Sequence, residues 1–534
     1  MIIYAVTVVL GACLLFLVQP LIAKIILPWF GGTSAVWSAA LVFFQVCVLG
    51  GYCYAHWLAT HIHPRRQGVI HGALLIIGCA LMPIMPSEAW RPTGAGDPML
   101  QILMLLAANV GLPALLLCST SPLLHVWYMR RMGSDVPYWL FALSNFGSML
   151  ALLSFPLLLE PLFDTRTLAI GWSALFVVYA ALCICAAWMS RKGAPLHESP
   201  AAGQTVRAPG LRLMGVWVLL SACAAAMLVA VSAHLSTNVA PIPLLWVAPL
   251  ALYLLTFILN FSSSRFYGRT SFFPLLAVAL GCIAYLYVNA DGNLHIQYVI
   301  PLYLAGLFLC CMACHGELAY GRPTAQFLTR FYLLIALGGA LGGVFVAVIA
   351  PTVFDTYLEL PLLLIVMAVL NAALQWRRRG SSRTLWPVRL AMIGGVVALT
   401  GYLARTELAS RNEHLLVRRN FYGVLRVRDD LVGTELASRH LIHGTISHGS
   451  QFLSDAYRGV AGSYFSTSSG VGRALQALQA QGSVRYGVIG LGAGVLASYA
   501  REGDYLRIYE INPDVFRIAD EFFTFLARAR AAGA

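Results

Sequence analysis

The sequence predicts a polytopic α-helical membrane bundle of about 12–13 spans, followed by a small β-domain and an incomplete Rossmann-like α/β domain of the methyltransferase type. Three observations predict this order. Of the 534 residues, 59% are hydrophobic and 11% are charged, with a mean hydropathy of +0.76, whereas soluble domains carry about 25% charged residues. Apolar segments long enough to cross a bilayer recur over residues 1–403. Residues 404–534 instead hold 15 Arg and 12 acidic side chains, as a small soluble domain would.

Each long apolar segment is interpreted as a membrane span because a transmembrane helix needs roughly 20 apolar residues. The third and the last segments are the shortest. The thirteen predicted spans lie near 3–27, 34–58, 68–85, 100–119, 137–159, 167–190, 212–234, 243–262, 270–289, 296–314, 329–351, 357–375 and 387–403.

The longest polar connection in this part, 191–211, divides six predicted spans from the next six. Major-facilitator transporters are built as six plus six spans with a central loop, so the chain is similar to them in architecture. The similarity stops there. That superfamily carries an acidic-and-basic signature between its second and third spans, and residues 55–68 contain no acidic residue.

Basic residues predict the orientation, since cytoplasmic loops are enriched in Lys and Arg. They occupy six loops that share one side with the N-terminus, which we therefore expect to be cytoplasmic. A thirteenth span would place the tail on the opposite face, unless one segment does not cross. The net charge of +13 comes from these flanking residues, so no nucleic-acid partner is expected. The six loops carry Arg65–Arg66, Arg130–Arg131, Arg191–Lys192, Arg265 with Arg269, Arg322 with Arg330, and Arg377–Arg379.

Polar residues within spans are costly and are therefore candidates for function. Glu160 ends the fifth predicted span, and His315 and Glu317 follow the tenth. One interpretation is hydrogen bonding between helices or snorkelling to the interface. The other is a polar cavity for a cation, with Glu160 or Glu317 as its counter-charge. No third or fourth ligand stands at a suitable spacing, so no metal site is predicted.

The tail opens with strand-like alternation in "YGVLRVRD", a turn containing Asp429, Asp430 and Gly433, and then "RHLIHG". This pattern predicts a β-hairpin or small sheet. Residues 470–482 predict a helix that stops at a glycine.

A glycine-rich turn follows in "VRYGVIGLGAG", where a short apolar strand leads to Gly490, Gly492 and Gly494. Helical sequence comes next, and a second strand ends in Glu510. Such glycines permit a tight turn and close approach of a ligand to a helix N-terminus, and an acid after the second strand can accept ribose hydroxyls. The pattern favours S-adenosylmethionine or its decarboxylated form over NAD. The alternative is an ordinary βαβ turn without a ligand.

The chain resembles bacterial membrane proteins in which a transporter-like part is fused to a spermidine synthase-like part. The resemblance runs nearly end to end. The segments that carry it are "FLVQPLIAKIILPWFGGTSAVWSAALVFFQ", "STSPLLHVWY", "YWLFALSNFGSMLALLSFPLLLEP" and "CHGELAYGRPTAQFLTRFYLLIALGGALGGVFVAVIAP" in the membrane part, and "FYGVLRVRDD", "LIHGTISHGSQ", "GVGRAL" and "YGVIGLGAGVLASYAREGD" in the tail.

The resemblance implies an aminopropyltransferase-type protein in the bacterial inner membrane, with a polyamine or another small amine as acceptor. It implies that the three glycines face the nucleoside and the methionine-derived part, and Glu510 the ribose. His443, Gly444, His448 and Gln451 would lie where the β-domain meets the cofactor, and Tyr464 on the substrate side. Phe465 and Ser466 depart from the family, which carries His and Glu after that tyrosine.

The family continues with an adenine-contacting Asp motif and an Asp-rich catalytic loop, and neither is present up to residue 534. Two parallel strands with one crossover helix and one trailing helix cannot bury both faces of a parallel sheet. We therefore expect an incomplete domain and impaired catalysis. The predicted domains are 1–403, 404–469 and 470–534. The main hypothesis is a membrane-tethered spermidine synthase-like protein. The alternatives are a membrane transporter or scaffold with a regulatory nucleoside-binding tail, and a different S-adenosylmethionine-linked enzyme.

Overall fold

The computed structural model describes residues 1–94, 96–132, 138–191, 209–239, 242–289, 295–323, 327–376, 382–444 and 446–534. It divides into two compact units. The first holds the helical bundle, and the second holds the tail with two short segments that precede it in the sequence. Their ranges are Met1–Tyr287, His295–Ala350 and Glu359–Leu399 for the first unit, and Val288–Leu294, Pro351–Leu358 and Thr400–Ala534 for the second.

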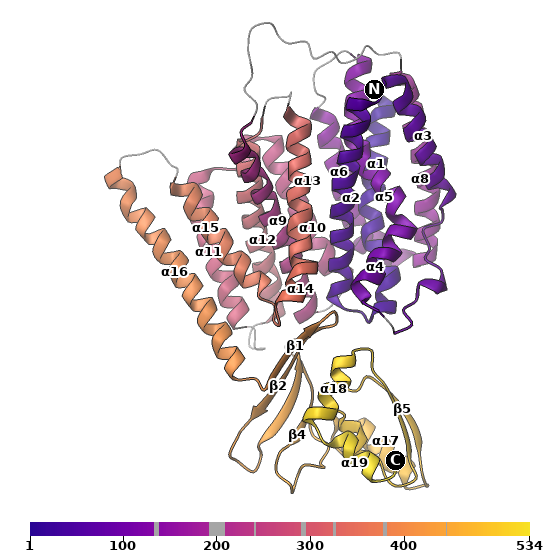
Figure 1. Ribbon diagram of the computed structural model, residues 1–534, viewed down its shortest axis with the longest axis vertical. Helices are drawn as coiled ribbons and strands as arrows, with labels where there is room; N and C mark the ends of the chain where they lie inside the picture. The colour runs from indigo at the N-terminus through magenta and orange to yellow at the C-terminus, as the bar shows by residue number, and fades with distance from the viewer. Residues whose placement is uncertain are drawn as a thin grey trace. The chain divides into compact units, whose positions relative to one another are not determined.

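In the described residues the first half of the bundle consists of six helical rods (Figure 1). Two of these rods change locally to a π-helical turn and then continue as α-helix. The elements are α1 (Ile2–Ile26), α2 (Ser34–His61), α3 (Pro64–Ala80), α4 (Pro98–Leu106) continued by α5 (Leu112–Met132), α6 (Tyr138–Ser154) continued by α7 (Glu160–Leu162), and α8 (Thr165–Ser190).

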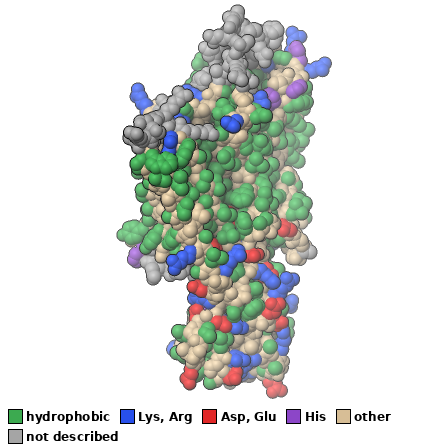
Figure 2. All heavy atoms as spheres, turned by 60° about the vertical axis from the view of Figure 1, so that its left-hand side comes forward, with side chains coloured by type: hydrophobic (Ala, Val, Ile, Leu, Met, Phe, Trp, Pro, Cys, Tyr) green, Lys and Arg blue, Asp and Glu red, His purple; other side chains and the backbone are tan. Residues whose placement is uncertain are grey.

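The second half repeats this arrangement and is followed by one more long helix, α16 (Ser382–Asn412). Its elements are α9 (Leu211–Asn238), α10 (Pro243–Ser262), α11 (Arg269–Val288), α12 (Ile296–Tyr320), α13 (Leu328–Val344) continued by α14 (Ala350–Val353), and α15 (Glu359–Trp376). Among the described residues, twelve helices are long and apolar enough to cross a membrane. The 17-residue α3 is not among them, whereas α16 is. The chain is therefore a polytopic helical membrane protein, and Figure 2 shows the broad hydrophobic surface of its bundle.

The two halves pack their helices in the same pattern. α1 packs on α6 and α8, as α9 packs on α13 and α15, and α2 packs on α5 as α10 packs on α12. α3 packs on α8, and correspondingly Asn371 of α15 donates a hydrogen bond to the Phe273 carbonyl of α11 at 3.2 Å. The halves meet through α2 with α13 and α6 with α10. This is the six-plus-six arrangement that the central loop predicts.

Small residues allow some of these helices to approach closely. On α13, an added Cβ at Gly338 would lie 2.4 Å from the Val218 carbonyl oxygen, and one at Gly342 would lie 2.2 Å from the Ala222 carbonyl oxygen. Val218 and Ala222 belong to α9. Two glycines four residues apart on one helix face are the usual device for tight packing of membrane helices. The α9–α13 contact therefore requires these glycines.

The tail begins with a four-stranded antiparallel meander in the order β1-β2-β3-β4. The strands are β1 (Leu416–Asn420), β2 (Gly423–Asp430), β3 (Ser438–His443) and β4 (Ile446–Phe452). The predicted hairpin is present as β2 and β3, and Asp429 and Asp430 belong to the end of β2 rather than to the turn. Side chains from β2 and β3 share one hydrophobic core with the residues after Gly490.

The rest of the tail contains α17 (Gly470–Gln479), the parallel pair β5 (Arg485–Ile489) and β6 (Tyr505–Tyr509), α18 (Pro513–Phe522) and α19 (Phe525–Ala531). The predicted crossover helix is a short 3₁₀ turn, Val495–Tyr499. Its length is limited because the Asp504 carboxylate accepts backbone hydrogen bonds from Val484 and Arg501, which turns the chain straight into β6.

The structure does not show the incomplete Rossmann-like methyltransferase domain that the sequence predicts. In the described residues, β5 and β6 form a two-stranded sheet. Alternate residues on both strands are exposed, including Ile489 with 94% of its surface accessible and Tyr509 with 53%. A parallel sheet is normally covered on both faces, so this pair differs from the core of a doubly wound domain.

Candidate functional site

Glu317 lies at the end of α12 and is paired with a base. Arg269, the first residue of α11, donates to both carboxylate oxygens of Glu317, with each N–O distance 2.6 Å. The Tyr267 hydroxyl donates to Oε1 at 3.1 Å. A bidentate pair fixes both side chains. In this conformation Glu317 joins α11 to α12, and its charge is balanced by Arg269 rather than free for a cation.

Glu160 is also paired. Lys24, near the end of α1, donates to Glu160 Oε1 at 2.8 Å, and their side chains are 32% and 22% exposed. The pair ties α1 to the end of the α6–α7 rod. The two carboxylates proposed as counter-charges for a cation each have a basic partner within the protein, as the hydrogen-bonding interpretation expects.

His315 is fully buried on α12. Its Nδ1 lies 2.8 Å from Thr256 Oγ1 on α10, and its ring centroid is 3.7 Å from that of Phe257. Nε2 has no hydrogen-bond partner among the described residues. The described part of the chain contains no group of three or more His, Cys, Asp or Glu that could hold a metal. His315 therefore connects α10 and α12 through one hydrogen bond and leaves one nitrogen unused.

A pair of tryptophans lies between the halves. Trp37 of α2 and Trp246 of α10 are fully buried, and their rings stack with centroids 5.1 Å apart and planes 10° apart. Neither residue is ionisable, so a search for charges inside spans does not find them. The sequence signal that identifies the two tryptophans is their equal position, because each is the fourth residue of its helix.

The three predicted cofactor-binding glycines all have positive φ, at +89° for Gly490, +56° for Gly492 and +82° for Gly494. They form the turn after β5. An added Cβ at Gly492 would lie 2.3 Å from the His448 carbonyl oxygen, whereas nothing lies within 4 Å of one at Gly490. Gly492 is thus required by the contact with β4, and Gly490 by backbone conformation alone.

Glu510 follows β6, and its carboxylate reaches the glycine turn. Oε2 accepts from the Leu491 amide and Oε1 from the Asn512 amide, both at 2.8 Å. An ionised carboxylate offers about four lone-pair sites, so each oxygen can accept one further hydrogen bond. The parallel strands place this acid beside the turn, as the spacing of the two motifs predicts.

His443 and His448 lie beside each other, with ring centroids 5.6 Å apart. Burial lowers the pKa of both, and the nearby Glu510 carboxylate opposes that change. His443 Nε2 lies 3.0 Å from the Tyr422 carbonyl oxygen. The structure therefore brings the two histidines, Glu510 and the glycine turn into one region.

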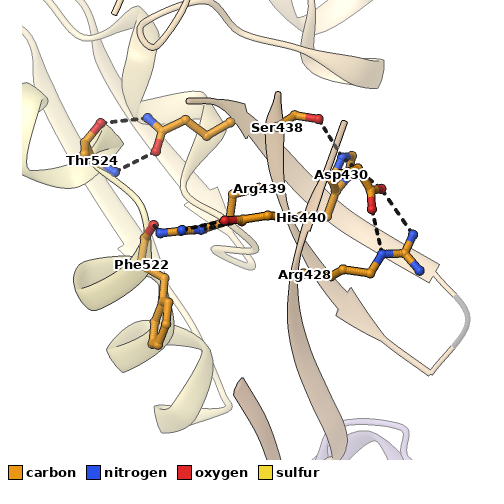
Figure 3. A network of polar contacts seen from close by, with 9 residues as sticks. Arg428, Asp430, Ser438, Arg439, His440, Phe522 and Thr524 are labelled. Atoms are coloured by element: carbon orange, nitrogen blue, oxygen red, sulfur yellow. Dashed lines mark hydrogen bonds and ion pairs between the residues drawn. The ribbon is translucent and has the colours of Figure 1, made fainter. Parts of the chain in front are cut away.

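Gln451 and Tyr464 have other surroundings. The buried Gln451 exchanges hydrogen bonds with Thr524 at 2.7 and 3.0 Å and donates to the Arg458 carbonyl. It belongs to a polar network that holds the meander to α18 and α19 (Figure 3). In the same network Arg439 pairs with Asp429 and donates to the Phe522 carbonyl. Tyr464 is 56% exposed, and its hydroxyl lies 3.4 Å from the Ser447 carbonyl.

No family model and no curated protein matches the chain. Solved structures do match. One, described as an auto-inhibited POT family peptide transporter, has a TM-score of 0.41 and 14% identity, with 79% of this chain and 100% of that chain covered. Another, the POT family transporter PepTSo, has a TM-score of 0.42 and 13% identity, with coverage of 77% and 98%. TM-scores below 0.5 do not establish a common fold.

Proposed function

We propose that the protein is a membrane transporter for a small solute, in which the two six-helix halves move against each other to open the bundle at one end and then the other. The repeated packing pattern of the halves carries this proposal, with α2 against α13 and α6 against α10 where they meet. Transporters built from two repeats bind solute between the repeats and alternate access by rocking one against the other.

The contacts inside the bundle fit such motion. The ion pair of Arg269 with Glu317 lies within the second half, and that of Lys24 with Glu160 within the first. Each pair stiffens its own half. Between the halves, the described contacts include one pair of stacked rings and one hydroxyl hydrogen bond, which separate at lower cost than buried ion pairs.

The test is uptake into proteoliposomes containing the purified full-length chain. The probes are radiolabelled glutamine, alanyl-alanine, putrescine and glucose, each with and without a proton gradient. We expect uptake of one class above protein-free liposomes, and its loss in Gly343→Phe. An added Cβ at Gly343 would lie 1.7 Å from Gln45 Oε1 and 3.3 Å from Val42 Cγ2, both on α2, so a phenyl group at this position must displace side chains packed between the halves. Gly395→Phe is the matched control, because nothing lies within 4 Å of that position on α16.

Uptake alone cannot exclude the proposal if the solute is missing from the panel. Inter-half distances measured by pulsed electron resonance provide the second readout. A single distance population at both ends of the bundle, under every gradient and every probe, would overturn the proposal.

Nucleoside binding by the tail is a second candidate function. The observation that favours it is the glycine turn with Glu510 at the neighbouring strand end, where the carboxylate keeps free acceptor sites. The proposed ligands are S-adenosylmethionine and its decarboxylated form, and an aminopropyl acceptor would be a polyamine or similar amine.

Calorimetric titration of the full-length protein with both compounds, and with ATP as a control nucleotide, tests this candidate. We expect binding that Glu510→Gln weakens by about tenfold, the effect of roughly one lost charge-assisted hydrogen bond. Absence of binding heat with both compounds would overturn the proposal that the tail binds a nucleoside, and it would leave the transport proposal unaffected.

A further inference from the structure

The stacked tryptophans occupy equivalent positions in the two halves. Trp37 is the fourth residue of α2, and Trp246 is the fourth residue of α10. α2 and α10 are the corresponding helices of the repeat. α2 packs on α5 of the α4–α5 rod and α10 packs on α12, and in each case the partner is the second rod further along the chain. The same residue therefore stands at the same register in both halves, and the two indoles meet face to face with planes 10° apart.

Both indole N–H groups are left without an acceptor. The Nε1 atoms of Trp37 and Trp246 are buried and have no hydrogen-bond partner among the described residues. Buried tryptophans usually find an acceptor, and an indole can only donate. Trp172 of the same bundle follows the usual rule, with its Nε1 donating to the Leu14 carbonyl at 2.8 Å. The stacked pair is thus held by ring contact while its polar atoms are unsatisfied.

Hydroxyl groups near the two tryptophans likewise combine a contact between the halves with unsatisfied polar atoms. Ser34, three residues before Trp37, shares a 2.8 Å hydrogen bond with Thr237 at the end of α9, which joins the two halves. The hydroxyls of Ser232 and Ser236, one turn apart on α9, are buried without a described partner. These segments lie at the end of the bundle where α1 and α9 finish and α2 and α10 begin.

We propose that Trp37 and Trp246 form the gate between the halves at this end of the bundle, and that the stacked pair is its closed state. The inference rests on the proposed transport function. Ring stacking favours closure. The two unsatisfied N–H groups disfavour it, because they gain acceptors from water or solute only when the rings separate. The opposing effects keep the gate near balance instead of locking it.

This balance predicts that two substitutions at one position act in opposite directions. Trp37→Phe keeps an aromatic ring but removes the unsatisfied donor, so we expect the ratio of closed to open gate to rise by about tenfold. Trp37→Ala removes the ring contact, so the same ratio should fall by about two- to tenfold. Trp246→Phe and Trp246→Ala should repeat both results, since the positions are equivalent.

The experiment measures distance distributions by pulsed electron resonance in lipid nanodiscs containing the full-length chain. The chain has twelve cysteines, so spin labels are attached through a genetically encoded ketone amino acid. One pair, at Glu88 and Ile242, reports on the gate end, and a second pair, at Arg65 and Arg265, reports on the other end. All four positions are exposed.

The two label pairs separate failure of the gate from failure of transport. Opposite shifts of the gate-end distances in the Phe and Ala variants support the gate. Two populations in the native protein that neither variant changes would overturn it and leave transport standing, whereas a single population at both ends would overturn transport itself. If an Ala variant does not fold, the shift of the gate-end distances in the Phe variants still tests the gate. Trp172→Phe, which removes a satisfied N–H, is the matched control and should not shift the gate-end ratio.

Discussion

At the scale of single residues, partners inside the protein decide what the intramembrane charges can do. The sequence identifies Glu160 and Glu317 because acids are rare in spans, but it cannot reveal that Lys24 and Arg269 neutralise them. These contacts join positions 136 and 48 residues apart in the sequence. Long-range pairing depends on helix packing, which no local pattern encodes.

Glu317→Gln should destabilise the bundle. It removes the charge that balances Arg269 and weakens a bidentate interaction whose carboxylate side is 5% exposed. We expect the free energy of unfolding to fall by about 1–3 kcal/mol, measured by SDS titration in mixed micelles. The control is Glu88→Gln, since the Glu88–Arg91 pair is 74% and 58% exposed and surface pairs contribute little. Equal effects of the two substitutions would contradict a structural role for Glu317.

The tail should lose local stability as the pH falls below the ordinary histidine pKa of about 6.5. Burial lowers the pKa of His443 and His448 in the folded state, so the unfolded chain binds more protons below this pH. Their contribution is complete above the unfolded pKa and is lost progressively as pH falls toward the lowered native values. Hydrogen exchange of segment 438–452, corrected for intrinsic rates, should show this loss.

Replacement of both histidines by glutamine provides the check on this pH dependence. The double variant should flatten the profile between pH 5 and 6.5, because the neutral amide has no proton to gain. An unchanged profile would assign the effect to other groups, of which His440 is one candidate, since burial also lowers its pKa.

At the scale of elements, local patterns predict helices and strands well where they repeat. In the described part of the chain the thirteen predicted spans correspond to thirteen helical rods, α1 to α16, because each apolar run is long and any charged residue in it lies near one end. The β2–β3 hairpin follows from alternation in the same way. The crossover after Gly494 is the exception. Its sequence resembles a helix, but Asp504 binds nearby backbone amides and ends it after one 3₁₀ turn.

Gly342→Ala should loosen the contact between α13 and α9. The added methyl group would lie 2.2 Å from the Ala222 carbonyl oxygen and 3.0 Å from the Ala226 amide nitrogen. Both atoms belong to the backbone, so one helix must shift, and overpacking of this kind costs about 1–3 kcal/mol. Gly395→Ala is the control, because nothing lies within 4 Å of that Cβ and alanine favours a helix over glycine. The same SDS titration should show opposite signs for the two variants.

At the scale of the whole molecule, the number of crossings decides where the tail lies. Thirteen spans place residue 1 and the tail on opposite sides, and the basic loops assign the first side to the cytoplasm. The count depends on two helices. α3 has 17 residues and so extends about 26 Å, short of the roughly 30 Å hydrocarbon core. Only 6% of the apolar window of α16 is buried, so lipid must cover most of it if it crosses.

Reporter fusions test the topology directly. With thirteen crossings, green fluorescent protein fused after Arg191 should fluoresce, since that loop is cytoplasmic, and alkaline phosphatase fused after Ala534 should be active, since it works only outside the cytoplasm. Fluorescence of a fusion after Ala534, without phosphatase activity, would mean that one rod does not cross. Fusions after Trp376 and after Asn412 then identify it. If both report the same side, α16 lies along the membrane, and if they report opposite sides, the short α3 is the rod that fails to cross. Because a nucleoside such as S-adenosylmethionine is made in the cytoplasm, only a cytoplasmic tail would keep its glycine turn within reach of that ligand.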